Sequence, residues 1–321
     1  MRQLFKDVSR LKDVICEENR PLAPMTTMKV GGDARLFVRP LSLSGLEGLL
    51  ALLHGVQVPY RVLGNGSNLI VDDGGVDLVI SLCSLRDMQL EQQGSLYVEA
   101  GCTLSSILGF CIENGLEGLE PLTGIPGSLG GALFMNAGAN GVSLGDFVDE
   151  ICVTTGQGST WLKVSHDFFS YRSSNTPEGA LISAARLKVN VDSHDEWTTG
   201  VPSDGSCLKR ATPRKVHERI KRIMRKRLSS QPLGRPSAGC VFKNPSVDCL
   251  AWRLIVECGL QGFKMNRAQV SPKHANFIVN LGDAKASDVI GLIDFVKERV
   301  WEQTGVMLKE EVVIWENETE H

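Results

Sequence analysis

Apolar residues recur at the spacing of an α-helix in several parts of the chain, and these parts predict its helices. Between residues 43 and 54, Leu46, Leu49, Leu50 and Leu53 fall on one helical face, as in a helix that packs one side on a core. The same periodicity predicts helices over residues 8–18, 43–54, 103–114, 248–258 and 287–304, and a further helix that starts at residue 212.

Short apolar runs bounded by turn residues predict strands between those helices. The runs are residues 60–63, 69–71, 78–82, 96–99, 150–155, 181–189, 274–280 and 310–315. Residues 191–210 are polar and contain Gly200, Pro202 and Gly205, so we place a domain boundary in this segment. After residue 212, helices and strands alternate, which is typical of a compact α/β or α+β unit.

One stretch, residues 124–140, concentrates glycine in a way that favours a binding loop. Glycine lets a backbone adopt positive φ or approach a ligand closely, and a run of main-chain amides can hold a pyrophosphate. Leu129, Leu133 and Phe134 interrupt the glycines, whereas a solvated linker would carry serine and charge instead. The glycines are Gly124, Gly127, Gly130, Gly131 and Gly138, with Ser128 and Asn136 as polar neighbours.

A second glycine loop, residues 63–71, resembles half of the dinucleotide fingerprint GxGxxG. Leu69 stands where the third glycine belongs, and a strand follows where that motif needs a helix. We therefore reject a Rossmann site. A strand–loop–strand with Gly64, Gly66 and Ser67 can still surround an anion with amides, although a plain hairpin turn explains the same pattern.

Composition narrows the class of protein. The chain has 321 residues, 42% of them hydrophobic and 22% charged, with a net charge of −3. These values predict an ordinary globular protein of about two domains and give no sign of nucleic acid binding. The N-terminal residues lack the apolar core of a signal peptide, and no apolar run is long enough to span a bilayer. We therefore expect a cytoplasmic protein without a membrane partner.

The cysteines and histidines suggest neither disulfides nor a metal. The nine cysteines are scattered without a CxxC pair, a pattern typical of reduced thiols in a cytoplasm. The six histidines form no HExxH motif or close cluster, so we expect no metal site.

The helix that starts at residue 212 has a densely basic face. A solvated surface explains such a face most simply, and a nucleic-acid role is disfavoured because aromatic platforms are absent. A third reading is that one or two of its arginines, such as Arg225, grip a ligand's phosphates. Arg172, which follows Phe168, Phe169 and Tyr171, is similarly open to two readings, an aimed half-buried arginine or a surface side chain lying over a ring.

Several motifs agree in order over nearly the whole chain. They are Thr27-Met28-Lys29-Val30-Gly31-Gly32, Leu63-Gly64-Asn65-Gly66-Ser67-Asn68, Gly124-Ile125-Pro126-Gly127-Ser128, Met135-Asn136-Ala137-Gly138, Tyr171-Arg172, Ser237-Ala238-Gly239-Cys240, Phe242-Lys243-Asn244-Pro245 and Glu310-Glu311-Val312. Together they resemble the UDP-N-acetylenolpyruvoylglucosamine reductase family, flavoenzymes of peptidoglycan precursor synthesis. Each motif is weak alone, and their joint order carries the resemblance.

The resemblance implies an α+β fold with an FAD-binding domain of the vanillyl-alcohol-oxidase type. It places that domain at residues 1–200, in two α+β subdomains of about 1–82 and 83–200, and a C-terminal α/β substrate-binding domain at 212–321. The FAD would be non-covalent, because no histidine occurs between His54 and His166 to attach it. The implied cofactor-binding residues are Leu63, Gly64, Asn65, Gly66, Ser67, Asn68, Pro126, Gly127, Ser128, Gly130, Gly131, Asn136 and Gly138.

The resemblance also implies a reaction, the reduction of the enolpyruvyl ether of UDP-N-acetylglucosamine to the lactyl ether of UDP-N-acetylmuramate with NADPH. Hydride would reach C3 of the enolpyruvyl group through the flavin, and negative charge would develop at C2. Arg172 matches the family's arginine that meets this charge, and Glu311 its stabilising glutamate. The family's proton donor to C2 is a serine, and Cys240 holds that position here. Substrate contacts would come from Lys243, Asn244, Gln269 and Arg225.

The chain departs from the family's pattern at Cys240, at Asn266-Arg267 and in a longer 191–210 segment, and it matches the shorter second type of the family. Two other functions stay open at this point. One is an FAD oxidase of the same cofactor fold acting on another substrate, and the other is a non-catalytic flavin- or nucleotide-binding module. We expect a monomer that binds small molecules.

Overall fold

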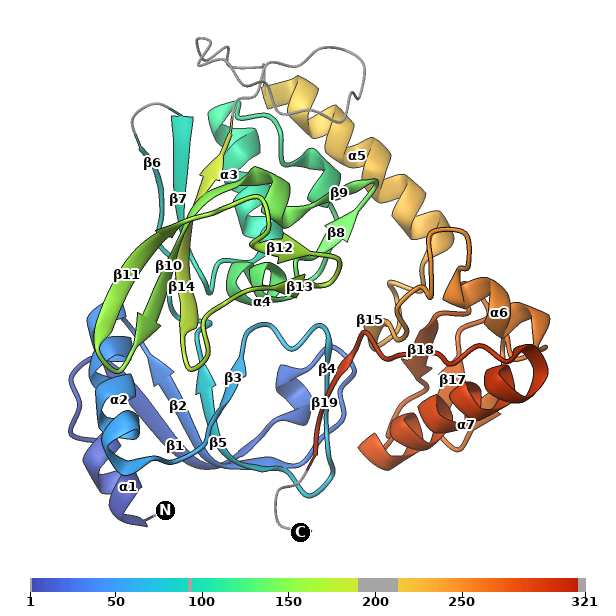
Figure 1. Ribbon diagram of the computed structural model, residues 1–321, viewed down its shortest axis with the longest axis horizontal. Coiled ribbons are helices and arrows are strands. Elements are labelled where there is room, and N and C mark those ends of the chain that lie inside the picture. Colours follow the sequence, from blue (N-terminus) through green and yellow to red (C-terminus); the bar gives the residue numbers. More distant parts are fainter. Residues whose placement is uncertain (1, 92–93, 190–212, 317–321) are drawn as a thin grey trace. The chain divides into compact units, whose positions relative to one another are not determined.

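A computed structural model describes residues 2–91, 94–189 and 213–316 (Figure 1). Its α-helices are α1 (Arg2–Val8), α2 (Leu43–Val56), α3 (Leu104–Asn114), α4 (Leu129–Phe134), α5 (Pro213–Ser230), α6 (Ala251–Glu257) and α7 (Ala286–Thr304). The strands are β1 (Val14–Pro21), β2 (Asp33–Pro40), β3 (Arg61–Leu63), β4 (Leu69–Val71), β5 (Val76–Ser81), β6 (Met88–Leu90), β7 (Ser95–Glu99), β8 (Gly138–Ala139), β9 (Val142–Ser143), β10 (Val148–Thr155), β11 (Gly158–Lys163), β12 (Phe169–Ser170), β13 (Ser173–Ser174), β14 (Leu181–Lys188), β15 (Ser237–Cys240), β16 (Lys264–Met265), β17 (Ala268–Val270), β18 (Phe277–Asn280) and β19 (Val313–Trp315).

The chain folds into two compact units that interleave along the sequence. The first unit comprises Met1–Cys16, Val38–Asn65 and Ile80–Arg227, and the second comprises Glu17–Phe37, Gly66–Val79 and Leu228–His321. The boundary falls inside β1, β2 and β5, which belong to a sheet of order β1-β2-β5-β3. The functional boundaries expected from the sequence, 1–200 and 212–321, stay a prediction, and the segment 191–210 lies outside the described residues.

The first unit contains a five-stranded sheet of order β11-β10-β14-β7-β6, whose neighbouring strands are all antiparallel (Figure 1). Its core joins apolar side chains of these strands to those of α3 and α4. The sequence predicts Thr103 and Gly115 as the caps of the helix over 103–114, and both are confirmed in α3. Thr103 accepts a hydrogen bond from the amide of Ser106, and Gly115 ends the helix in the left-handed region, which satisfies otherwise unpaired backbone groups.

The second unit contains a four-stranded sheet of order β15-β18-β17-β16, against which α7 packs through β16 and β17. The helical spacing within 287–304 predicts one buried apolar stripe, and α7 confirms it, since its members are all fully buried: Val289, Leu292, Ile293, Val296 and Val300. A separate parallel pair joins β19 to β4, in the register Val313 to Leu69. This pair brings the end of the chain beside the second glycine loop.

Three local predictions were wrong. The helix expected over 8–18 does not form: α1 ends at Val8, and residues 14–21 form the strand β1. Asp13 there has a left-handed φ of 56°, which breaks a helix, and the run that follows pairs into a sheet instead. The helical spacing after residue 212 predicts Met224 in a buried stripe, but Met224 is 37% exposed on α5. The sequence predicts Ser287 as the cap of the last long helix, but α7 begins at Ala286 and its N-cap residue is Lys285.

Within residues 2–91, 94–189 and 213–316, every helix is too short or too polar to cross a membrane.

Candidate functional site

The two glycine loops meet in the first unit. A Cβ added to Gly64 would lie 2.3 Å from the Oγ of Ser128 and 3.9 Å from the amide nitrogen of Gly131. Gly64 follows β3, and Ser128 directly precedes α4 without donating or accepting a side-chain cap bond. The contact therefore joins residues far apart in sequence, and the space between the loops is one that a side chain at position 64 would fill.

Polar groups without partners face this meeting point. Ser128 is 2% exposed, and its Oγ is buried without a hydrogen-bond partner among the described residues. No described residue accepts a hydrogen bond from the amides of Gly64 and Asn65. A buried polar group is costly unless it is bonded, so the Ser128 hydroxyl favours a polar ligand at this point, and the amides of the partly buried Gly64 and the exposed Asn65 can donate to the same ligand. The donor set and the missing Cβ fit an FAD diphosphate held by main-chain amides.

Other predicted cofactor glycines are required by the fold itself. A Cβ at Gly130 would lie 2.9 Å from the Cβ of Ala100, and a Cβ at Gly138 would lie 2.7 Å from the carbonyl oxygen of Val142. Gly127 has a φ of 141°, so any side chain there would strain the backbone. Pro126 directly precedes it, and Leu63 is buried at the end of β3. Substitutions at these positions would test folding rather than cofactor binding.

Gly131 allows a cleaner test of the cofactor site. A Cβ there has Ser128 Oγ as its nearest neighbour, at 3.7 Å, and the backbone is not left-handed. We expect Gly131→Val to fold but to purify largely without FAD, because the side chain would occupy space that the cofactor needs. Gly109→Val in α3 is the matched control, since a Cβ at Gly109 meets nothing within 4 Å. Thermal melting and the flavin absorbance per protein measure the outcome, and a fully yellow, folded Gly131→Val protein would refute this assignment.

Arg172 also lies in the first unit, in an unusual backbone conformation. Its φ is 57°, a left-handed value that is uncommon for residues other than glycine. The side chain donates from Nη2 to the carbonyl oxygen of Gly138 at 3.4 Å, and its guanidinium lies 5.1 Å from the ring centroid of Tyr171. Arg172 is thus an aimed, partly buried arginine, held against the strand that starts at Gly138. Sparsely populated backbone conformations of this kind are enriched at functional sites.

Asn136, expected to contact the cofactor, supports this segment. Its Nδ2 donates to the carbonyl oxygen of Ser170 at 2.9 Å, and its Oδ1 accepts from the amide of Gly145 at 3.0 Å. The nitrogen and the oxygen of the side-chain amide are therefore both hydrogen-bonded within the protein. The structure places Asn136 beside the backbone that leads to Arg172.

Cys240 and Glu311 lie on adjacent backbone segments of the second unit. The amide of Glu311 donates to the carbonyl oxygen of Val241 at 2.7 Å, and the amide of Lys243 donates to that of Lys309 at 2.8 Å. Both predicted catalytic side chains are partly buried. The structure therefore places the backbone segments that carry Cys240 and Glu311 side by side, although about 70 residues of sequence separate them.

The irregular strand β15 carries Cys240. Its pairing with β18 shifts register between Ser237 and Cys240, and Gly239 within the shift has a φ of 80°. Such an irregularity changes the direction in which the following side chain points. Gly239 is therefore the residue that allows Cys240 to be aimed differently from a regular strand residue.

Glu310, the residue before Glu311, forms an ion pair with Lys297. Burial by itself raises the pKa of Glu310, but a hydrogen bond from Lys297 outweighs it and holds the pKa below the usual carboxyl value. Glu310 is thus an ionised member of an ion pair.

The segment after Cys240 depends on a residue that the sequence analysis missed. Asn276 is 4% exposed, accepts from the amide of Phe242 at 2.9 Å and donates to the carbonyl oxygen of Phe242 at 2.8 Å. A buried asparagine that bonds both backbone groups of one residue fixes that residue's orientation. Its signal in the sequence was a polar residue inside the predicted strand 274–280.

The remaining predicted substrate residues are spread over several elements. Asn244 Oδ1 accepts from the amide of Ala251 at 3.1 Å, at the start of α6. Arg225 is exposed on α5. On the same helix, Arg219 pairs with the buried carboxylates of Glu117 and Glu120, at 3.2 and 3.4 Å. One basic residue of α5 therefore holds the segment that precedes the glycine loop.

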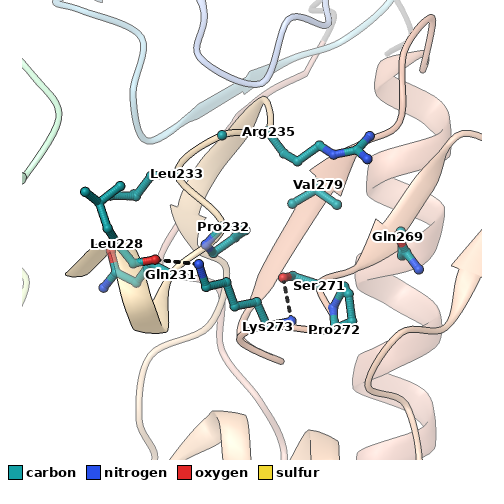
Figure 2. Close-up of a pocket in the computed structure, with 11 residues that line it drawn as sticks. Leu228, Gln231, Pro232, Leu233, Arg235, Gln269, Ser271, Pro272, Lys273 and Val279 are labelled. Atoms are coloured by element: carbon teal, nitrogen blue, oxygen red, sulfur yellow. Dashed lines mark hydrogen bonds between the residues drawn. The ribbon is translucent and has the colours of Figure 1, made fainter. Parts of the chain in front are cut away.

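Figure 2 shows a pocket of about 360 Å³ in the second unit. Gln269, a predicted substrate residue, lines it and donates from Nε2 to the carbonyl oxygen of Gly262 at 2.9 Å. Arg235 and Lys273 also line it, as does Gln231, whose Oε1 is buried without a partner among the described residues. None of these three residues was predicted from the sequence as a site residue. The pocket combines positive charge with an unused hydrogen-bond acceptor.

No group of three or more potential metal ligands occurs in the part of the chain that the structure describes, and the described cysteines form no disulfide.

Family models match both parts of the chain. Residues 34–162 match an FAD binding domain, and residues 231–315 match the C-terminal domain of UDP-N-acetylenolpyruvoylglucosamine reductase. The first of these matches confirms the predicted FAD-binding fold, and it includes both Gly64 and Gly131.

Whole-length relatives agree with these models. The UDP-N-acetylenolpyruvoylglucosamine reductase of Syntrophobacter fumaroxidans is 41% identical over 96% of this chain and 86% of its own length. That of Thermotoga maritima is 38% identical over 91% of this chain and 96% of its own. A crystal structure of the reductase from Thermus caldophilus covers 94% of this chain and 99% of its own, with a TM-score of 0.75 and 33% identity.

Proposed function

The chain belongs to the UDP-N-acetylenolpyruvoylglucosamine reductase family, and from this premise we propose that Arg172, Cys240 and Glu311 carry out its chemistry. The protein is an FAD-dependent oxidoreductase that uses NADPH to reduce UDP-N-acetylglucosamine enolpyruvate to UDP-N-acetylmuramate, a step of peptidoglycan precursor synthesis. The family membership favours this reductase over the two alternatives that the sequence left open, an FAD oxidase and a non-catalytic binding module.

Bound FAD supplies the hydride that reaches C3 of the enolpyruvyl group. The residues of this chain have two tasks around that step. Negative charge develops at C2 and spreads into the neighbouring carboxylate, so a fixed cation is needed there, and C2 must then receive a proton. Arg172 supplies the cation, and its fixed guanidinium, hydrogen-bonded to Gly138, requires little rearrangement when the charge appears.

Cys240 gives the proton from its Sγ to C2, and Glu311 lies beside it to stabilise the intermediate. The observation that carries this assignment is the hydrogen bond from the Glu311 amide to the carbonyl oxygen of Val241, the residue next to Cys240. It holds the two groups on neighbouring backbone. A thiol is a stronger acid than the serine hydroxyl that the family uses, so the exchange of one for the other preserves the role.

The pocket in Figure 2 is suited to the nucleotide part of the substrate. Arg235 and Lys273 supply positive charge for a diphosphate, and the buried Oε1 of Gln231 can accept a hydrogen bond from a base. Gln269 belongs to the same lining. Lys243, Asn244 and Arg225 complete the proposed set of substrate contacts. We further propose a cytoplasmic monomer, with non-covalently bound FAD and no nucleic acid partner.

Glu311→Gln tests the assignment in two separate measurements. Mixing with NADPH should bleach the flavin absorbance at the wild-type rate, because the carboxyl group is not needed for that step. Return of the absorbance on anaerobic addition of the enolpyruvyl substrate should slow about tenfold, since glutamine keeps the shape but cannot share a proton, a loss of ~1.4 kcal/mol. Equal slowing of both steps would indicate a structural role and contradict the proposal.

A further inference from the structure

At the start of the β4–β19 ladder, the side chain of Asn68 makes a hydrogen bond that its own backbone amide would make in a regular ladder. In this parallel pair, the amide of Val313 donates to the carbonyl oxygen of Asn68 at 3.0 Å. A regular parallel ladder then continues from the amide of residue 68 to the carbonyl oxygen of residue 311. Here the side-chain Nδ2 of Asn68 makes that bond to Glu311 instead, at 3.0 Å.

This exchange has a consequence at each end of the bond. The carbonyl oxygen of Glu311 can only accept, so the bonded atom of Asn68 must be the amide nitrogen. The backbone amide of Asn68, released from the ladder, has no acceptor among the described residues. One residue of the glycine loop thus fixes Glu311 with its side chain while it keeps a main-chain donor available at the loop.

Glu311 is held through both of its backbone groups as a result. Its amide donates to Val241 and its carbonyl oxygen accepts from Asn68. Without the bond from Asn68, the carbonyl oxygen of Glu311 loses its donor, and the backbone at Glu311 is held only by its own amide and by the bonds of the neighbouring residues. A shift of about 1 Å in a reacting group can lower a rate about 100-fold, so the second bond matters for any reaction of the Glu311 side chain.

We propose that the side chain of Asn68 is a positioning residue for Glu311 rather than a ligand of the cofactor. This inference rests on the proposed role of Glu311. Asn68 acts through the Glu311 backbone, so its loss should affect the proton-transfer half of the reaction and leave cofactor affinity intact. A side-chain cofactor contact makes the opposite prediction, a fall in FAD affinity.

Asn68→Asp is the isosteric test, because a carboxylate cannot donate to the Glu311 carbonyl oxygen. Return of the flavin absorbance with the enolpyruvyl substrate should slow about tenfold, while bleaching by NADPH and the dissociation constant of FAD stay within about twofold of wild type. Asn68→Ala should give the same slower return of absorbance, with the same unchanged bleaching and FAD affinity, and it adds no charge. Asn114→Asp is the matched control, since it removes an amide donor from the carbonyl oxygen of Phe110 and should keep wild-type rates.

A double-mutant cycle with Glu311→Gln separates the possible outcomes. If Asn68 acts through Glu311, Asn68→Ala should slow the Glu311→Gln protein by less than about twofold further. Three results would overturn the inference if Glu311→Gln alone remains slow. They are full additivity of the two changes, a fall in FAD affinity that matches the lost rate, and wild-type rates in both Asn68 variants. A wild-type rate in Glu311→Gln would remove Glu311 from the reaction, which overturns the proposed function and this inference together. If turnover is lost, the FAD content of the purified Asn68 variants still separates the two roles. Wild-type FAD content supports a positioning role, and a loss of FAD supports a side-chain contact to the cofactor.

Discussion

Cys240→Ala should lower turnover by about 100- to 10,000-fold, the range that loss of a positioned general acid produces. The variant should still be bleached by NADPH, because the thiol acts only after hydride reaches the substrate. Adding the enolpyruvyl substrate should then restore the absorbance very slowly. Stopped-flow absorbance measures both steps. An alanine variant that turns over at the wild-type rate would leave Cys240 as a small, partly buried thiol without a chemical role.

Cys240→Ser is the informative companion, since it restores the hydroxyl acid that the family uses at this position. It should keep substantial activity. Iodoacetamide should inactivate the wild type, bound substrate should protect it, and the serine variant should resist. The comparison with serine is needed because Cys16, Cys83, Cys249 and Cys258 are also partly exposed. Equal inactivation of the serine variant would assign the effect to one of those thiols.

Arg172→Ala should lower turnover by about 100- to 1,000-fold, or ~2.7–4 kcal/mol, the cost of removing one electrostatic donor from a developing oxyanion. The loss should fall on the reaction with the enolpyruvyl substrate and spare the bleaching by NADPH. Rates of the two steps, measured separately by stopped-flow absorbance, show which is affected.

Arg172→Lys controls for the backbone. Lysine and alanine are strained alike at the left-handed φ of 57°, so any difference between the two variants reports the side chain. Lysine keeps the charge but loses the planar fork, and its turnover should lie between those of alanine and wild type. Identical losses in lysine and alanine, spread over both steps, would show that Arg172 supports the fold of the loop around Gly138.

The sequence was sufficient wherever the decisive interactions are local. The apolar stripe of α7 and the caps of α3 at Thr103 and Gly115 depend on residues three or four positions apart, and each was predicted correctly. The motif order also identified the family and its cofactor, because that likeness is carried by residue types alone. The N-terminal helix over 8–18 failed since its segment pairs as β1 in a sheet, and sheet pairing can override the local pattern.

The arrangement of the site was decided by tertiary structure. The contact between Gly64 and Ser128, the closeness of Cys240 to Glu311 and the bond from Asn68 to Glu311 join segments 64 to 243 residues apart. No periodicity records such contacts, because they depend on the path of the chain between the segments. From sequence alone, Asn68 was assigned to the cofactor with its whole loop. The parallel pairing of β4 with β19 is what brings its side chain to the Glu311 carbonyl oxygen, since only adjacent strands share a ladder.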